Sequence, residues 1–203
     1  MKLSLSVLLP LLLLLAPALA HAQGWKLTRN RDGIKVYQSE GSSGFRNIKV
    51  ECELAGSFEG FTKVLGNVAG FRNWVYGNKQ AYILKRTDAN DYYYYSETAI
   101  PWPLQNRDAV VRARIERDPQ GRWLKLTESG VSGLVPPQEG KVRVTKSNIT
   151  WTLTQKAPGL LGIVYVFEAE PGGSIPAWIA NAFADKGPYE SFKKLSVLLK
   201  APQ

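Results

Sequence analysis

A long series of extended segments that ends in one amphipathic helix most constrains the fold of this chain. Turn formers separate the segments, as in Asp-Ala-Asn-Asp, Asp-Pro-Gln-Gly and Ala-Pro-Gly, and such short connections are typical of an antiparallel meander. A parity change between Val144 and Ile149 predicts a hairpin turn at Lys146 to Asn148. The extended segments are predicted at about 79–87, 91–99, 107–117, 121–129, 140–146, 149–156 and 161–170.

Three more extended segments and a short turn are predicted near the start of the folded part. Ile48, Val50, Cys52 and Leu54 alternate with charged residues, so one face of this strand is apolar. Cys52 on that face is expected to act as a small hydrophobe and not as a reactive thiol. Arg31-Asp32-Gly33 predicts a turn between two short extended runs.

Two regions have helical spacing. Between Ser57 and Val75 the apolar residues recur every three or four positions, which predicts one or two helices with Ser57 as the N-cap. Gly172-Gly173-Ser174 followed by Pro176 predicts the start of a long C-terminal helix. Gly187-Pro188 is expected to break or kink that helix and to act as a hinge that admits a ligand.

This order of elements predicts an α+β domain. A large antiparallel sheet can bury one face by curling around the final helix, and the two layers leave room between them. Proline and glycine punctuation without repeats or low-complexity linkers indicates one domain over residues 23–203.

Residues 1–22 have the pattern of a secretory signal peptide. Lys2 precedes an apolar run, and Ala20-His21-Ala22 places small residues at the cleavage positions. Cleavage after Ala22 predicts a periplasmic or secreted protein. An uncleaved membrane anchor is the alternative, although the run is short for a membrane span and proline interrupts it.

The net charge of +9, or +8 without Lys2, indicates a basic surface. The Lys and Arg residues are scattered and form no continuous tract, which favours transient contact with an anionic membrane surface over a nucleic-acid partner. The alternative is that the basic residues only keep the protein soluble and bind no partner. We expect a monomer.

The residues available for catalysis are few. His21 is the only histidine, and it lies in the segment predicted to be removed. The remaining chain therefore lacks the imidazole needed for Ser-His-Asp or Cys-His catalysis and for the usual zinc or non-haem iron sites. A metal site would have to consist of oxygen ligands alone. Carboxylate acid–base chemistry stays open, because burial can raise the pKa of a Glu or Asp.

Two charged residues occur at apolar positions of predicted strands. Arg107 shares a register with Val111 and Ala113, and Glu97 shares one with Tyr93 and Tyr95. Charges inside an apolar cavity are costly and tend to find each other or a ligand group. We therefore expect these side chains to face an interior cavity; contact with water at strand ends is the alternative.

Four stretches carry a family resemblance. They are Trp25-x-Leu27 followed by Gly33-Ile34-x-Val36-Tyr37, then Asn73-Trp74, then Pro101 to Arg107-Asp108, and Pro171-Gly172-Gly173-Ser174-Ile175-Pro176-Ala177-Trp178. Their order and spacing resemble the START domain, the steroidogenic acute regulatory protein-related lipid-transfer family. The resemblance implies a helix-grip fold, in which a curved antiparallel sheet wraps around a long C-terminal α-helix with an internal cavity. It implies that this cavity holds one lipid and that the helix and a neighbouring loop form its gate.

The resemblance also implies the function. The expected role is to bind a single hydrophobic lipid, such as a sterol-like molecule or a phospholipid, and to carry or sense it in the cell envelope without a cofactor. Some sterol- and lipid-binding members pair an inward acid with an arginine six residues after the Arg of the Arg-Asp motif; Glu97 matches the acid, but the position six residues after Arg107 is Ala113. The resemblance implies no catalytic residue and no metal site. The candidate ligand-binding residues are Tyr93, Tyr95, Glu97, Arg107, Val111, Ala113, Trp151, Phe167, Trp178, Ile179 and Phe183.

Two other functions stay open from sequence. One is a cyclase- or hydrolase-like enzyme on the same fold, with Glu97 and either Tyr93 or Tyr95 as acid–base groups. The other is a scaffold or assembly module in the envelope, which an interior filled by side chains would favour.

Overall fold

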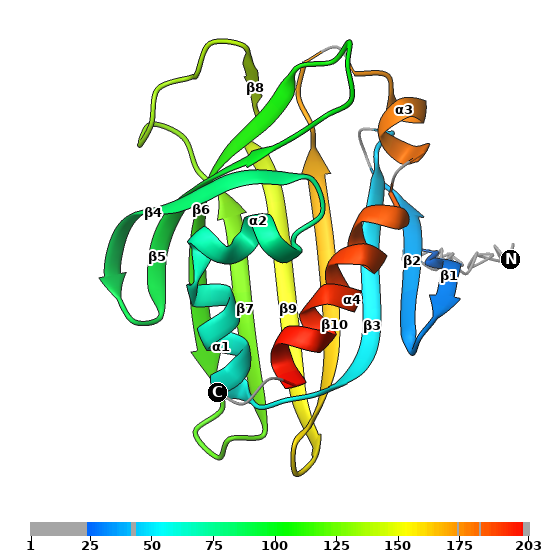
Figure 1. Cartoon of the computed structure of the whole chain (residues 1–203), viewed down its shortest axis with the longest axis vertical. Helices are drawn as coiled ribbons and strands as arrows, with labels where there is room; N and C mark the ends of the chain where they lie inside the picture. The colour runs from blue at the N-terminus through cyan, green and yellow to red at the C-terminus, as the bar shows by residue number, and fades with distance from the viewer. Residues whose placement is uncertain (1–23, 42–43, 174, 183, 201–203) are drawn as a thin grey trace, which may run out of the picture.

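A curved sheet with helices on its concave face forms the molecule (Figure 1). The computed structural model describes residues 24–41, 44–173, 175–182 and 184–200. The strands in these ranges are β1 (Lys26–Arg31), β2 (Ile34–Glu40), β3 (Arg46–Ala55), β4 (Asn78–Asp88), β5 (Asp91–Thr98), β6 (Asn106–Arg117), β7 (Trp123–Gly130), β8 (Lys141–Arg143), β9 (Lys146–Ala157) and β10 (Leu160–Glu170). The helices are α1 (Phe58–Gly66), the 3-10 turn η1 (Val68–Gly70), α2 (Phe71–Trp74), α3 (Ala177–Ala182) and α4 (Lys186–Lys200).

The strands form one sheet in the order β1-β2-β3-β10-β9-β7-β6-β5-β4, with antiparallel pairing throughout this path. The chain returns to the middle of the sheet through β10, which lies between β3 and β9. The predicted α+β helix-grip architecture is confirmed.

Local signals explain why several elements form where they do. The Ser57 hydroxyl accepts a hydrogen bond from the Gly60 amide at 3.0 Å, so the predicted N-cap of α1 is confirmed. Asp32 and Gly33 both have positive φ, 54° and 75°, and form the predicted tight turn between β1 and β2. Cys52 is buried on the apolar face of β3, where burial raises the pKa of its thiol to about 12.

Helix α4 closes the core against the sheet. Its buried face carries Tyr189, Phe192, Leu195 and Leu199, which recur at helical spacing. This face packs on β2 and β3 and also meets α1 and α2. Helices α1 and α4 cover only part of the concave face. The sheet extends beyond them toward α3 (Figure 1).

The expected long C-terminal helix is instead two helices. Helix α3 ends at Ala182 and α4 begins at Lys186, so the interruption precedes Gly187-Pro188. Pro188 lies in the first turn of α4, where its missing N–H leaves no intrahelical bond unmade. The break predicted at Gly187-Pro188 is therefore wrong by a few residues. Ser174, the predicted N-cap, lies outside the described residues.

The hairpin predicted at Lys146 to Asn148 is also wrong. Strand β9 already begins at Lys146, while β8 pairs in parallel with the start of β6 through Asn106–Lys141 and Asp108–Arg143. The parity change arises because Val144 lies in the short connection after β8, whereas Ile149 belongs to β9.

No helix in the described part of the chain is long and apolar enough to cross a membrane. The predicted signal peptide, residues 1–22, lies outside the described residues.

Candidate functional site

A cavity of about 1170 Å³ lies between the concave face of the sheet and the helices. Strands β3, β5, β6, β7, β9 and β10 form its wall, and α2, α3 and α4 cover it. Most of its lining side chains are aliphatic or aromatic. The space left between the two layers by this architecture is therefore large and mainly apolar.

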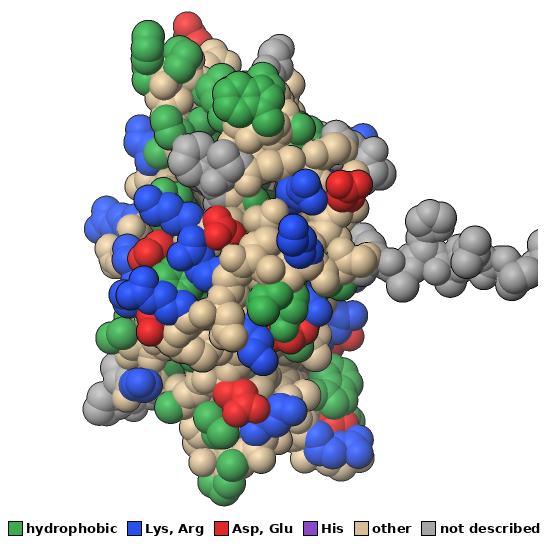
Figure 2. Space-filling model, turned by 90° about the vertical axis from the view of Figure 1, so that its right-hand side faces the viewer, with side chains coloured by type: hydrophobic (Ala, Val, Ile, Leu, Met, Phe, Trp, Pro, Cys, Tyr) green, Lys and Arg blue, Asp and Glu red, His purple; other side chains and the backbone are tan. Residues whose placement is uncertain are grey.

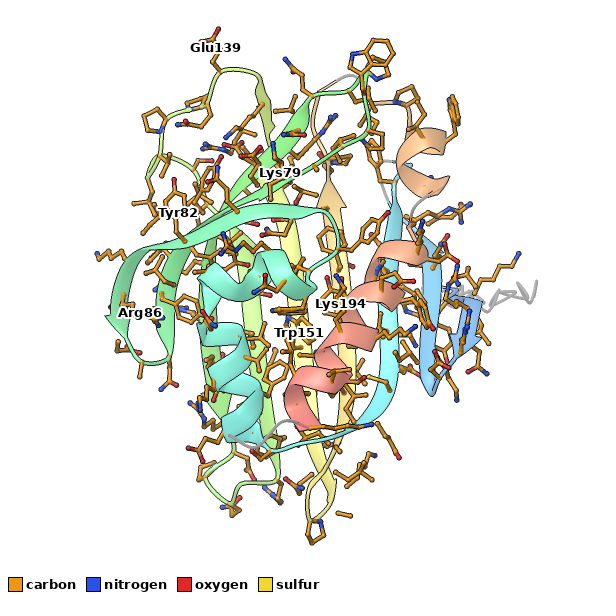
Figure 3. All side chains as sticks on the ribbon, in the orientation of Figure 1. Lys79, Tyr82, Arg86, Glu139, Trp151 and Lys194 are labelled. Carbon is orange, nitrogen blue, oxygen red and sulfur yellow. The ribbon has the colours of Figure 1, made fainter. Side chains whose placement is uncertain are left out.

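Aromatic rings form the inner end of the cavity. Trp151 on β9 lies between the helices and the sheet (Figure 3), with its ring centroid 4.5 Å from that of Tyr165 and 5.3 Å from that of Phe192. Phe61 of α1 meets the edge of the same indole at 5.4 Å. This cluster closes the cavity beneath α1 and α4.

A buried carboxyl group lies beside this cluster. Glu128 on β7 is 3% exposed, and it accepts hydrogen bonds from the Tyr94 hydroxyl at 2.7 Å and the Trp151 indole N–H at 3.0 Å. Burial raises the pKa of Glu128, and the two hydrogen bonds oppose that rise. In the described ranges no Lys or Arg forms an ion pair with it.

Sequence reasoning missed Glu128, although a signal for it exists. Leu124 and Leu126 precede it on the apolar face of β7, so the same parity argument that singled out Arg107 also singles out Glu128.

The opposite end of the cavity is its mouth, which is framed by the β5–β6 loop (residues 99–105) and α3. Two lining side chains here are highly exposed, Trp102 at 92% and Trp178 at 74%. Figure 2 shows hydrophobic side chains gathered at this end of the molecule, whereas charged side chains of both signs cover the middle. The mouth therefore has an apolar rim.

Arg107 ties the two sides of the mouth together. Its guanidinium donates to the carbonyl oxygens of Gln105 at 2.6 Å, Pro171 at 3.3 Å and Gly172 at 3.3 Å. Gln105 is in the β5–β6 loop, and the other two carbonyls precede α3. Burial lowers the pKa of Arg107, and no carboxylate among the described residues pairs with it.

The structure brings six of the predicted site residues to the cavity wall. Ala113 is fully buried on the same face of β6 but is not part of the lining, because Tyr92 and Glu128 flank it on the neighbouring strands. Phe183 lies outside the described residues. The six lining residues are Arg107, Val111, Trp151, Phe167, Trp178 and Ile179.

Tyr93, Tyr95 and Glu97 do not face the cavity, so their expected orientation is wrong. The cavity side of β5 carries Tyr94, Ser96 and Thr98 instead. The run from Tyr92 to Tyr95 puts two phenols on each face of β5, and alternation alone does not tell which face is inward. The outer face is also covered, since Tyr82 stacks on Tyr95 with a centroid distance of 5.0 Å.

Glu97 is held by cations and amides on that outer face. Lys141 of β8 lies 2.7 Å from its carboxylate and Lys79 lies 3.6 Å away. Although burial opposes ionisation, hydrogen bonds from Lys141, Gln80 and Asn106 lower the pKa of Glu97 to about 2. Glu97 therefore pairs with lysine and not with Arg107, and the acid–base pair considered for an enzyme is not in the cavity.

The described part of the chain has no cluster of three or more His, Cys, Asp or Glu side chains that could hold a metal ion. What the cavity offers is an apolar volume, a buried carboxyl group at one end and an apolar rim at the other.

Comparisons with known proteins agree with this geometry. A family model described as START domain matches residues 11–202. An uncharacterized protein of Pseudomonas aeruginosa is 31% identical over 178 residues, which cover 87% of this chain and 87% of that protein. The phosphatidylcholine transfer protein of Mus musculus is 31% identical over 179 residues, which cover 84% of this chain and 81% of that protein.

Solved structures share the fold. A STAR-related lipid transfer protein from Xanthomonas axonopodis superposes with a TM-score of 0.79 at 31% identity, over 88% of this chain and 99% of that one. Human STARD10 superposes with a TM-score of 0.75 at 23% identity, over 87% of this chain and 73% of that one, and this likeness concerns the fold alone.

Proposed function

The chain belongs to the START domain family, and from this membership we propose that it binds one hydrophobic lipid in its cavity and carries or senses that lipid. The relatives named for lipid transfer support this proposal, as the mouse phosphatidylcholine transfer protein and the Xanthomonas protein do.

The observation that carries the proposal is the cavity of about 1170 Å³ with its mainly apolar wall. Small-molecule sites usually enclose about 300–1,000 Å³, so the volume of about 1170 Å³ exceeds that range and suits a ligand as large as a lipid. Burial of several hundred Å² of ligand hydrocarbon, at about 25 cal/mol per Å², favours binding by several kcal/mol even after the cost of ordering the ligand. Lipid binding of this kind requires no reactive group and no cofactor.

The mouth suits contact with a membrane. Trp102 and Trp178 present exposed indoles on both sides of it, and indole rings are favoured at the boundary between lipid and water. The net charge of +9 favours transient attraction to an anionic surface. We propose that the protein acts as a monomer, docks by this rim and exchanges its lipid there.

We further propose that this exchange occurs in the cell envelope, after cleavage behind Ala22. The proposal is supported by the residue pattern of positions 1–22. Fractionation of host cells and mass measurement of the exported protein test it: a mass that begins at Gln23 is expected, and a full-length cytoplasmic protein would contradict it.

Native mass spectrometry of the protein purified from its own host tests lipid binding. We expect a one-to-one complex whose extra mass is released by organic solvent and identified as a lipid. Ala109→Trp should abolish the complex while the protein stays folded, because Ala109 lines the cavity and an indole there fills the space that the lipid would occupy.

A matched control introduces the same residue on the other face of the sheet. Val164 of β10 is 39% exposed and points away from the cavity, so Val164→Trp should keep the lipid. Lipid binding is excluded if the wild-type protein neither retains lipid nor takes it up from vesicles, and binding in the cavity is excluded if Ala109→Trp retains as much lipid as Val164→Trp.

A further inference from the structure

The inner end of the cavity contains polar groups that a hydrocarbon chain end would leave without partners. A carboxylate offers about four hydrogen-bond acceptor positions, and Glu128 uses one for Tyr94 and one for Trp151. Tyr165 also lines the cavity, and its hydroxyl makes no hydrogen bond to any described residue. A ligand that reaches this end therefore meets an acceptor with spare capacity and a free hydroxyl group.

Distance along the sheet separates these groups from the mouth. Glu128 pairs across strands with Ala113, which follows Arg107 on β6 by six residues. At about 3.3 Å per residue the separation is roughly 20 Å. A lipid that lies along the cavity thus places one end near Arg107 at the mouth and the other end beside Glu128.

Charge restricts what this inner end of the ligand can be. A phosphate group beside Glu128 would face a carboxyl group, and the described residues supply no cation that pairs with it there. An ammonium group would bring three N–H donors into an apolar region with few acceptors. A hydroxyl group needs one acceptor and one donor, and Glu128 and Tyr165 provide one of each kind.

We propose that Glu128 binds a hydroxyl group at the buried end of the lipid, and so selects ligands that enter the cavity with an uncharged alcohol first, an inference that rests on the lipid binding proposed above. The selection acts against lipids whose inner end is hydrocarbon, because such an end offers the buried carboxyl group no N–H or O–H from which to accept a hydrogen bond. It also acts against phosphate and ammonium groups at that end.

Three ligands that share one hydrocarbon chain test the proposal: hexadecan-1-ol, its methyl ether and hexadecylamine. They are offered in equimolar mixture to delipidated protein, and native mass spectrometry measures the occupancy of each. We expect the alcohol to exceed the ether and the amine by about tenfold or more, which corresponds to one hydrogen bond to a buried charged group. An amide oxygen still accepts a hydrogen bond, so Glu128→Gln should reduce this preference, and Glu128→Leu should abolish it.

Glu97→Gln is the matched control. Glu97 has the same exposed fraction as Glu128, 3%, and lies on the opposite face of the sheet, so its variant should keep the wild-type preference. Near-ultraviolet circular dichroism establishes that each variant is folded, and Glu128→Gln still supports a conclusion if Glu128→Leu does not fold.

The possible failures are distinguishable. If the wild-type protein binds none of the three probes and no vesicle lipid, the proposed function itself fails. If it binds alcohol and ether equally, or prefers the amine, or if Glu128→Gln and Glu97→Gln discriminate alike, the role of Glu128 is overturned while lipid binding stands.

Discussion

Glu97 and Glu128 show at the residue scale how position on a strand decides what a buried carboxyl group does. Each is 3% exposed. Lys141 and Lys79 surround Glu97, and its pKa falls to about 2, whereas the partners of Glu128 are neutral and burial raises its pKa. The ion-paired residue links β5 to Lys141 of β8 on the outer face of the sheet, and the unpaired one faces the cavity.

Glu97→Gln should weaken the fold in a pH-dependent way. A carboxyl group whose pKa is about 2 when folded and 4.5 as its ordinary value stabilises the fold fully above pH 4.5, and this contribution disappears as the pH falls through 2. A shift of this size is worth roughly 3 kcal/mol at neutral pH. Urea unfolding should therefore show Glu97→Gln to be less stable than wild type at pH 7, with the difference shrinking toward pH 2.

The control for this prediction is Glu53→Gln on the exposed face of β3, which should leave the unfolding free energy within about 0.5 kcal/mol of wild type. A difference between Glu97→Gln and wild type that stays constant from pH 7 to pH 2 would contradict the assignment of the stabilisation to the ionised carboxylate.

Residue positions were predictable where only one face of a strand is apolar. Cys52 and Val111 follow from simple alternation, because charged residues mark the outer face. Tyr93, Tyr95 and Glu97 could not be placed in this way, since the side chains of Lys141 and Tyr82 lie against the outer face of β5, so residues on both faces are buried. That cover comes from residues distant in sequence.

At the scale of elements, the junction between α3 and α4 shows what proline and glycine do in this chain. The junction lies before Gly187-Pro188, and a Cβ atom added to Gly187 would lie 3.2 Å from Cδ1 of Tyr76. Glycine at this position permits the close approach of α4 to the segment after α2. Sequence alone predicted an interruption of the helix, but the tertiary contact that explains the glycine was not visible in the local pattern.

An ion pair holds this junction to the edge of the sheet. The guanidinium of Arg29 on β1 contacts Asp185, immediately before α4, with Nη2 to Oδ2 at 2.9 Å and Nε to Oδ2 at 3.2 Å. If movement of α3 at this junction opens the cavity, Arg29→Gln should raise the rate of lipid exchange. Because a partly exposed ion pair contributes up to about 1 kcal/mol, the increase should be about fivefold at most.

Stopped-flow transfer of a fluorescent lipid from loaded protein to vesicles measures this rate. Arg122→Gln serves as the control, because Arg122 also pairs with an aspartate, Asp118, at 2.7 Å, but between β6 and β7 and away from the junction. Equal exchange rates for Arg29→Gln and Arg122→Gln would show that the junction does not limit exchange.

On the scale of the whole molecule, the order of elements predicted the architecture but not the composition of its interior. A meander followed by an amphipathic helix leaves few ways to bury the sheet, so the grip around α4 could be expected. The volume of the cavity depends on how far α1 and α4 extend along the sheet. The polarity of its inner end depends on Glu128, which belongs to β7 in the middle of the sheet.

Transfer between membranes should depend on the apolar rim at the mouth. Trp102 and Trp178 are 92% and 74% exposed, and insertion of each indole into a membrane surface should contribute about 1.5–3 kcal/mol. The double variant Trp102→Ser with Trp178→Ser should therefore transfer lipid between anionic vesicles at least tenfold more slowly, while its equilibrium occupancy by lipid changes little. Fluorescence dequenching between donor and acceptor vesicles measures the rate.

The control variant, Val164→Ser with Val197→Ser, removes apolar side chains that are 39% and 66% exposed elsewhere on the surface, and it should transfer lipid at the wild-type rate. Added salt should slow wild-type transfer, because it screens the attraction between the basic protein and the anionic surface. If both double variants transfer equally fast, docking does not occur at the mouth.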